Sequence, residues 1–248
     1  MDSGKKEISA QKTDLKKYKK SKTRKLFYWL LIDISVAIIV FALLLYRPGR
    51  YRPFEATFDS NQTEQIDIDI TNKLGPEVYD NFQSGKPFDV VITEDVLNYI
   101  LKLVDWPIEN NGVMLYAPAG LLLPGTIVLM GTADIEGVEL IVTIEIKPQI
   151  NDKGLLNMHV AAVKVGALNL TPLAKTMAKK MYTQKLTEVN ADMSALKTRI
   201  VASLLNEEPF DPVFSIEKKS LRLENFNIEK GQITAHIVPY KPASTPLR

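Results

Sequence analysis

The chain has no cysteine and only two histidines among its 248 residues. Without cysteine, neither a disulfide nor a thiolate metal site can form. His159 and His236 have no carboxylate or second histidine at a metal-ligand spacing in the sequence. No Gly-x-Ser-x-Gly elbow, phosphate-binding loop or dinucleotide-binding fingerprint occurs. These absences argue against a metalloenzyme, and we expect no metal and no cofactor.

Paired carboxylates are the remaining candidates for catalysis, and the pairs are Asp67/Asp69, Glu94/Asp95 and Glu207/Glu208. Alternation places the first pair on the polar face of a strand, and the second stands where the N-terminus of an expected helix favours negative charge. The third pair falls in an expected loop. Solvation or helix capping accounts for each pair, so we expect no catalytic residue and a non-enzymatic protein.

Charge is distributed unevenly along the chain. Residues 1–25 hold ten Lys or Arg and three acids, whereas residues 53–248 hold 18 basic and 25 acidic residues, a net charge of −7 (18 − 25). A basic tail therefore precedes an acidic body. The body has no basic stripe interleaved with aromatics, which argues against nucleic acid as a partner.

One long apolar run, Leu26 to Tyr46, predicts a transmembrane helix. Its 21 residues would span roughly 30 Å as a helix, which matches the thickness of a bilayer core. The run is too long for a signal peptide and no small-x-small cleavage site follows it, so we expect an uncleaved signal-anchor. The basic residues before it outnumber those just after it, which predicts a cytoplasmic N-terminus and an extracytoplasmic body at the cell membrane.

Polar and aromatic residues within this run carry further expectations. Trp29 and Tyr46 stand near the two ends, where amphipathic rings favour the membrane interface. Asp33 costs on the order of 3 kcal/mol inside a bilayer. It either reaches toward the basic residues before the helix or contacts another membrane helix, which would imply a protein complex.

The segments that follow suggest a simple organisation. Residues 1–25 are expected to be a cytoplasmic tail, 26–46 the span, 47–58 a stalk rich in Arg, Pro and Gly, 59–240 an exported domain and 241–248 a frayed end. Within the domain, strands are expected at 65–70, 88–92, 112–116, 126–134, 138–146, from 155, 219–228 and 232–238, and helices at 76–82, 93–105, 172–190 and 191–205. The predicted fold class is α+β: an N-terminal transmembrane helix, then a curved antiparallel sheet packed on one or two long helices.

Residues 159–181 join a strand to a helix with almost no loop. The parity of the apolar residues changes near Ala161-Ala162, which predicts a β-bulge, and Gly166 permits a second bend. Thr171 and Pro172 predict the start of a helix whose apolar residues recur at i, i+3 and i+4. This corner brings much apolar surface to one place.

The order of elements resembles the YpmS-like family of membrane-anchored bacterial proteins. The family's Phe-x-Val-x-Leu-Thr-x-x-x-Leu-Asn element reads here Phe88, Val90, Ile92, Thr93, Leu97 and Asn98; its Gly-x-Leu reads Gly154 and Leu156; and its Gly-x-Leu-x-Leu-Pro corner reads Gly166, Leu168, Leu170 and Pro172, with Thr171 inserted. The resemblance implies no catalytic or ligand residue. More distantly the chain is similar to the tubular lipid-binding (TULIP-like) superfamily, whose apolar groove between sheet and helix implies lipid handling.

Two hypotheses for function follow. In the first, the exported domain binds a lipid or similar amphiphile in a groove lined by Leu97, Ile100, Leu101, Val142, Ile144, Met158, Val160, Leu168, Leu170, Met177 and Met181. In the second, the same residues fill a core, and the protein acts in envelope structure or assembly through protein–protein contacts. Apolar spacing alone is compatible with both.

Overall fold

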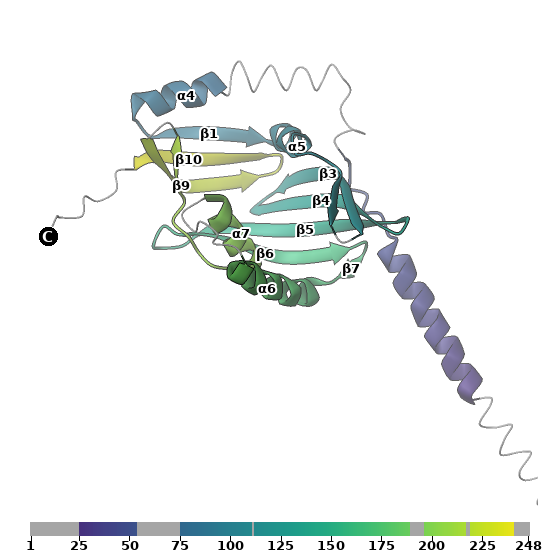
Figure 1. The fold of residues 1–248 in the computed structure, drawn as a ribbon. Coiled ribbons are helices and arrows are strands. Elements are labelled where there is room, and N and C mark those ends of the chain that lie inside the picture. The colour runs from purple at the N-terminus through teal and green to yellow at the C-terminus, as the bar shows by residue number, and fades with distance from the viewer. Residues whose placement is uncertain (1–24, 54–74, 111, 189–195, 217–218, 241–248) are drawn as a thin grey trace, which may run out of the picture. The chain divides into compact units, whose positions relative to one another are not determined.

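The computed structural model describes residues 25–53, 75–110, 112–188, 196–216 and 219–240 (Figure 1). The basic tail before residue 25, the expected strand at 65–70, residues 54–58 of the expected stalk and the expected frayed end lie outside the described residues. The chain divides into two compact units, one ending at Leu44 and the other beginning at Leu45.

The first unit is an apolar helix, Lys25–Leu44, long and apolar enough to cross a membrane. Leu26, Trp29 and Asp33 lie on it and are exposed. The helix ends two residues before the end of the predicted span. Pro48 disfavours helical geometry at the residue before it, and Tyr46 already belongs to the second unit.

The second unit contains two antiparallel sheets. The strands are β1 (Phe88–Thr93), β2 (Ile108–Asn110), β3 (Val113–Leu123), β4 (Thr126–Ile135), β5 (Val138–Ile150), β6 (Leu156–Val165), β7 (Leu168–Asn169), β8 (Val213–Ile216), β9 (Lys219–Glu229) and β10 (Gln232–Tyr240). One sheet has the order β1-β10-β9-β8 and the other β2-β3-β4-β5-β6-β7. The sheets meet at their turns, since Gly231 N–H donates to Leu122 C=O and Gly125 N–H donates to Ile228 C=O.

The helices of this unit are α4 (Gly75–Ser84), α5 (Glu94–Lys102), α6 (Thr171–Glu188) and α7 (Leu196–Asn206). Thr93, where the sequence predicts a helix to begin, is the N-cap of α5, because its side chain accepts a hydrogen bond from Val96 N–H at 3.3 Å. The α+β class and the N-terminal apolar helix are confirmed as well.

Two side chains fix α5 to β3. Asn98, which is 7% exposed, donates to Gly120 C=O and accepts from Gly120 N–H at 2.9 and 2.7 Å. The carboxylate of Glu94 accepts from Leu122 N–H at 2.9 Å. Glu94 thus serves as a structural link between α5 and the sheet, and a side chain on Gly120 would meet Leu97 at 2.8 Å.

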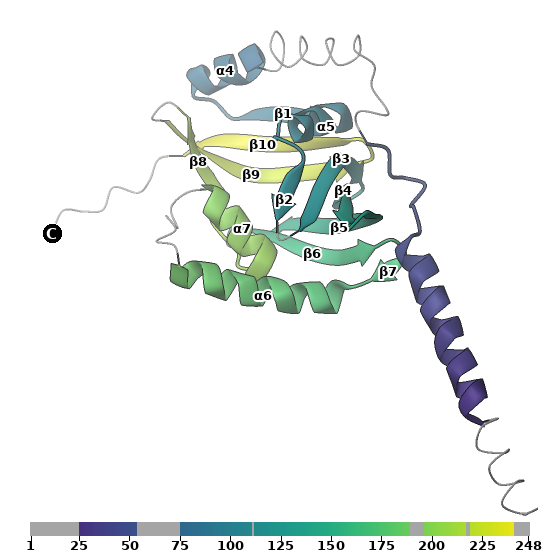
Figure 2. The ribbon, with the colours of Figure 1, turned by 45° about the vertical axis from the view of Figure 1, so that its right-hand side comes forward.

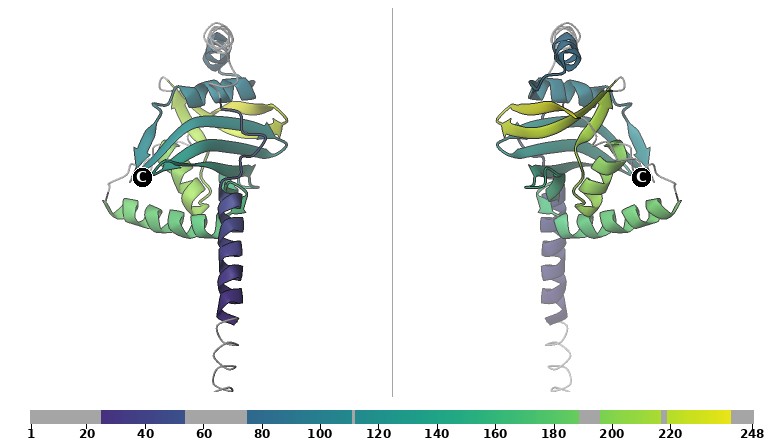
Figure 3. Two further views of the ribbon diagram at one scale, coloured as in Figure 1. Left: turned by 90° about the vertical axis from the view of Figure 1, so that its right-hand side faces the viewer. Right: turned by 90° about the vertical axis from the view of Figure 1, so that its left-hand side faces the viewer.

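One cross-strand row shows which helices share a face of the six-stranded sheet. Gly120, Leu129, Ile144 and Val163 are direct neighbours on β3, β4, β5 and β6. Side chains directly opposite each other point to the same face. Leu97 of α5 lies over Gly120 at one end of the row, and Ala174 of α6 lies near Val163 at the other. Helices α5, α6 and α7 therefore lie on the same side of this sheet (Figures 2 and 3).

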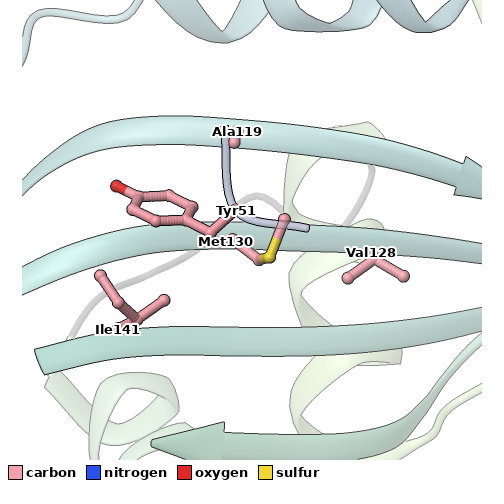
Figure 4. Packing of buried hydrophobic residues seen from close by; sticks show 5 residues of the cluster. All are labelled: Tyr51, Ala119, Val128, Met130 and Ile141. Carbon is pink, nitrogen blue, oxygen red and sulfur yellow. The ribbon is translucent and has the colours of Figure 1, made fainter. Parts of the chain in front are cut away.

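Tyr51 covers the opposite face of the same sheet. It is 8% exposed and packs with Ala119, Val128, Met130 and Ile141 (Figure 4). Its hydroxyl donates to Ala117 C=O at 2.6 Å and lies 2.8 Å from the hydroxyl oxygen of Thr132. This packing explains why Ile141, the single apolar residue on the polar side of β5, is buried. The folded unit begins earlier than the sequence predicts, because Tyr51, within the expected stalk, is a core residue.

The predicted bulge in β6 is confirmed. Glu145 pairs with Ala162 and Ile146 with Val160, so Ala161 has no partner in the register. This extra residue places Val160 and Val163 on the same face. The outer edge of β6 bonds to side chains as well as to β7: Met158 N–H donates to the Ser203 hydroxyl at 2.8 Å, and Val163 N–H donates to the Thr171 hydroxyl at 2.9 Å.

Candidate functional site

A cavity of about 470 Å³ lies between the six-stranded sheet and helices α6 and α7. We call it the helix-side cavity. Its volume falls within the range of small-molecule sites, about 300–1,000 Å³. Its residues are Leu129, Ile144, Ile146, Val160, Val163, Ala174, Lys175, Ala178, Lys179, Leu204, Leu205, Asn206 and Glu207. Nine of the thirteen are apolar, and the four polar residues come from α6 and from the end of α7 and the residue after it.

Local geometry at the strand-to-helix corner positions α6 over the sheet. Gly166 adopts a φ of 57°, which favours glycine, and the two-residue strand β7 follows. The Thr171 hydroxyl accepts from Val163 N–H of β6, so the first residue of α6 is attached to the sheet. The chain therefore turns back along β6, and α6 begins beside Val163.

Small residues on the inner side of α6 leave room for the cavity. Ala174 and Ala178 line it, whereas Leu173 and Met177 are each 56% exposed. These two bulky apolar side chains thus face outward. Met177, which the sequence places in the candidate groove, is not among the residues that line this cavity.

A polar cluster centred on Glu207 stands at the edge of the cavity. The carboxylate of Glu207 lies 2.6 Å from the Lys175 ammonium and 3.2 Å from Nδ1 of His159. The hydrogen bond from Lys175 lowers the pKa of Glu207, and the charges of Lys175 and His159 act in the same direction against partial desolvation. The cluster joins α6 and β6 to the residue that follows α7.

Glu207 also has unusual backbone geometry. Its φ is 57°, in the left-handed region, and its N–H donates to Ser203 C=O at 3.0 Å. This is the position at which glycine commonly ends a helix. A residue with a side chain costs about 1–2 kcal/mol more in this conformation. The side chain is thus held at the edge of the cavity despite local strain.

The structure brings only part of the predicted groove together. Ile144 and Val160 line the cavity. Leu97 and Leu101 pack against Gly120 instead, and Ile100 is 49% exposed. Val142, Met158, Leu168 and Leu170 are partly buried and are not among the lining residues, and the side chain of Met181 lies outside the described part of α6.

Sequence reasoning missed the contribution of α7 and the residue after it. Leu204, Leu205 and Glu207 line the cavity, but only the third lies in a charged pair that the sequence singles out. The spacing of Ala174 and Ala178, four residues apart with lysines after each, was a usable signal. Small residues on one side of a helix allow close approach or leave space.

Further cavities lie elsewhere in this unit, including two beside the six-stranded sheet. One, of about 650 Å³, lies at the C-terminal end of α5 beside Trp106, Met114 and Tyr116, with Lys102, Asp105 and Asp134 among its residues. Hydrogen bonding to the Glu139 carboxylate raises the pKa of Tyr116 to about 12. The other, of about 310 Å³, lies against the face that Tyr51 covers.

Each histidine is partly exposed and lies beside a carboxylate. His236 Nδ1 lies 2.6 Å from Asp89, and its Nε2 lies 3.7 Å from Glu224. His159 pairs with Glu207 as described above. Within the described ranges, no group of three or more His, Cys, Asp or Glu side chains is arranged to hold a metal ion.

Comparison with known proteins assigns no family. No family model, no curated protein and no solved structure matches this chain.

Proposed function

We propose that this is a single-pass membrane-anchored envelope protein whose domain from Leu45 onward binds a lipid or similar amphiphile in the helix-side cavity, without catalysis. The helix Lys25–Leu44 supplies the anchor. The ten basic residues within residues 1–25 favour a cytoplasmic N-terminus and an extracytoplasmic domain. A protease added to intact cells is expected to remove the domain, and full protection would contradict this orientation.

The observation that supports lipid binding is the apolar lining of the helix-side cavity. Residues from three strands and two helices enclose about 470 Å³ with few hydrogen-bonding groups. Each methylene that moves from water into such a site gains about 0.8 kcal/mol. An acyl chain or a comparable apolar group suits this lining better than a polar metabolite, whose hydrogen-bonding groups would have few partners.

The edge of the cavity favours an amphiphile over a purely apolar ligand. Lys175, Lys179 and Glu207 lie beside apolar residues from the sheet and helices. A polar head at this edge would meet charged side chains and solvent while the apolar part lies inside. The proposal also includes the finer fold features suggested by the YpmS-like and TULIP-like resemblances, namely a curved sheet around α6.

Filling the cavity tests this proposal. Ala178→Trp in the full chain places a large ring on the inner side of α6, whereas Met177→Trp places it on the exposed outer side. Organic extracts of the purified proteins are analysed by mass spectrometry. We expect lipid to co-purify with the parent chain and with Met177→Trp, and to be depleted at least about tenfold with Ala178→Trp, since a loss of 1.4 kcal/mol corresponds to tenfold.

Two outcomes would contradict lipid binding. One is the absence of any co-purifying or transferable lipid from the parent chain. The other is an equal lipid content of both tryptophan variants when circular dichroism shows that both are folded like the parent chain, which would mean that the lipid does not occupy the helix-side cavity.

A second candidate is a structural or assembly role. The C-terminal end of α5 exposes Ile100, Leu103 and Val104 at 49%, 66% and 45%. Exposed apolar side chains that lie close together favour a protein contact. This role predicts that Leu103→Ser reduces cross-linking to neighbouring proteins in native membranes while the lipid content stays unchanged. Cross-linking that is the same for both chains would count against it.

A further inference from the structure

A second cavity lies on the opposite face of the six-stranded sheet from the helix-side cavity. The row Ala119, Met130, Thr143 and Lys164 crosses β3 to β6 on the face that Tyr51 covers. The cavity measures about 310 Å³ and lies between this face and the segment around Arg50. We call it the Tyr51-side cavity.

Thr143 gives this cavity an unsatisfied polar group. It is 7% exposed, it lines the cavity, and its hydroxyl oxygen has no hydrogen-bond partner among the described residues. Leaving a buried hydroxyl unpaired is unfavourable. Rotation about its Cα–Cβ bond can turn the hydroxyl toward the cavity, where a ligand oxygen would complete its bonding.

The charged residues around the cavity favour an anion. Arg50 and Lys164 contribute two positive charges and Glu145 one negative charge, a net charge of +1 (2 − 1). Lys164 is the direct cross-strand neighbour of Thr143, and its ammonium lies 2.6 Å from the carboxylate of Glu145. Arg50 makes no ion pair within the described part of the chain. Its guanidinium can therefore bind two oxygens of a phosphate at once.

The remaining lining is mostly apolar, and one of its residues, Tyr46, is close in sequence to the apolar helix. Leu121, Leu123 and Met130 line the cavity beside Tyr46. Tyr46 follows Leu44, the last helical residue, by two positions, and a step of two residues spans at most about 7 Å. If the helix is the membrane anchor, the Tyr46 wall of the cavity is kept within reach of lipid head groups.

We propose that the Tyr51-side cavity binds the phosphate of a membrane lipid through Arg50, Lys164 and the Thr143 hydroxyl, with the first part of the lipid chains against Leu121 and Met130. The assignment of the phosphate to a membrane lipid rests on the proposed membrane anchor. The phosphate chemistry rests on the geometry of this cavity alone. This site is separate from the helix-side cavity.

Ligand-induced thermal stabilisation of the full chain in a nonionic detergent tests the site. The probes are inorganic phosphate, dihexanoyl phosphatidic acid and dihexanoyl phosphatidylcholine. We expect phosphatidic acid to stabilise the chain most. Arg50→Gln and Lys164→Gln should each weaken its apparent Kd at least about tenfold, because each removes a charge-assisted hydrogen bond. Arg52→Gln, an exposed arginine outside the lining, is the matched control and should change the Kd less than about twofold.

Thr143→Val separates a binding role from a structural one. Valine keeps the shape of threonine and removes the unsatisfied hydroxyl, so the ligand-free chain should unfold at a higher temperature. The proposal expects Thr143→Val also to weaken binding of phosphatidic acid by about threefold or more, since a hydrogen bond is lost. Unchanged affinity would mean that Thr143 is merely an unpaired core group.

Other results would overturn the assignment. Equal effects of Arg50→Gln and Arg52→Gln would place the anion elsewhere. Equal stabilisation by inorganic phosphate and phosphatidic acid would indicate a free-phosphate site. Equal stabilisation by phosphatidic acid and phosphatidylcholine would show that the cavity does not select an anionic head. Because all three probes are soluble, failure of the membrane anchor would leave these results unchanged.

Discussion

At the scale of single residues, Glu207 combines backbone strain with electrostatic attraction. It adopts a left-handed φ of 57° while its carboxylate contacts Lys175 and His159. Because its pKa is lowered by Lys175, the ionised form is favoured more in the folded chain than in the unfolded chain. The ionised Glu207 therefore stabilises the folded chain at pH values above 4.5, the ordinary pKa of a glutamate. This stabilisation is lost as the pH falls from 4.5 through the lowered pKa.

The lowered pKa of Glu207 predicts how stability depends on pH. The free energy of unfolding of the parent chain should fall as the pH drops from 4.5 through the lowered pKa, and Glu207→Gln should lose part of that dependence. Since both partners are more than a third exposed, the difference at neutral pH should stay within about 1 kcal/mol. Urea unfolding of the full chain in detergent at several pH values measures it.

The control for this prediction is Glu109→Gln, which changes an exposed glutamate on β2. Its pH profile should match that of the parent chain. A Glu207→Gln profile that overlays the parent profile would show that the contacts with Lys175 and His159 contribute nothing measurable.

At the scale of elements, α5 packs tightly against β3 at Gly120. A Cβ on Gly120 would lie 2.8 Å from Leu97 Cδ2 and 3.0 Å from Leu97 Cγ. Gly120→Ala should therefore destabilise the domain by about 1–3 kcal/mol through overpacking, and move α5 away from β3 so that the bonds between Asn98 and Gly120 weaken. Thermal unfolding of the full chain measures the effect.

Two variants make this prediction specific. Gly131→Ala on the neighbouring strand meets nothing closer than Tyr116 O at 3.6 Å and should change stability by less than about 1 kcal/mol. Leu97→Ala combined with Gly120→Ala should recover part of the loss, because it removes the clashing atoms. Absence of recovery would indicate that strand geometry, and not contact with α5, requires glycine here.

The elements show why sequence reasoning succeeded for strands and failed for the cavity. The bulge at Ala161, the N-cap at Thr93 and the shared apolar face of Val142 and Ile144 are local patterns of backbone geometry. Which side of α6 faces the sheet is not set by a local sequence pattern. Ala174 and Ala178 line the cavity and Met177 is exposed, because the attachment of Thr171 to β6 sets how the helix lies on the sheet.

At the scale of the whole molecule, the second unit depends on residues that precede the expected domain. Tyr51 bonds to residues 66 and 81 positions away, and no periodicity in an Arg- and Pro-rich segment signals such contacts. Its burial also raises the pKa of its hydroxyl, so the neutral form is maintained. The segment 47–53 is thus part of the fold even though its composition is typical of a linker.

A truncation tests this dependence. A fragment of residues 54–248 should unfold at a lower urea concentration than one of residues 45–248. Its free energy of unfolding should be smaller by on the order of 3 kcal/mol, because a buried aromatic side chain is lost. Tyr51→Ala in the longer fragment should reproduce most of that difference. Equal stability of the two fragments would show that Tyr51 covers the sheet without stabilising it.

If the helix Lys25–Leu44 anchors the chain in a membrane, the outer edge of β6 bears on contacts between neighbouring copies. An unpaired strand edge offers backbone N–H groups to any second strand, and proteins anchored in one plane meet at a raised effective concentration. Here the Ser203 and Thr171 hydroxyls accept two of those N–H groups, from Met158 and Val163. These two N–H groups are therefore not available to a strand from a neighbouring copy, which disfavours sheet-to-sheet aggregation even at a high local concentration.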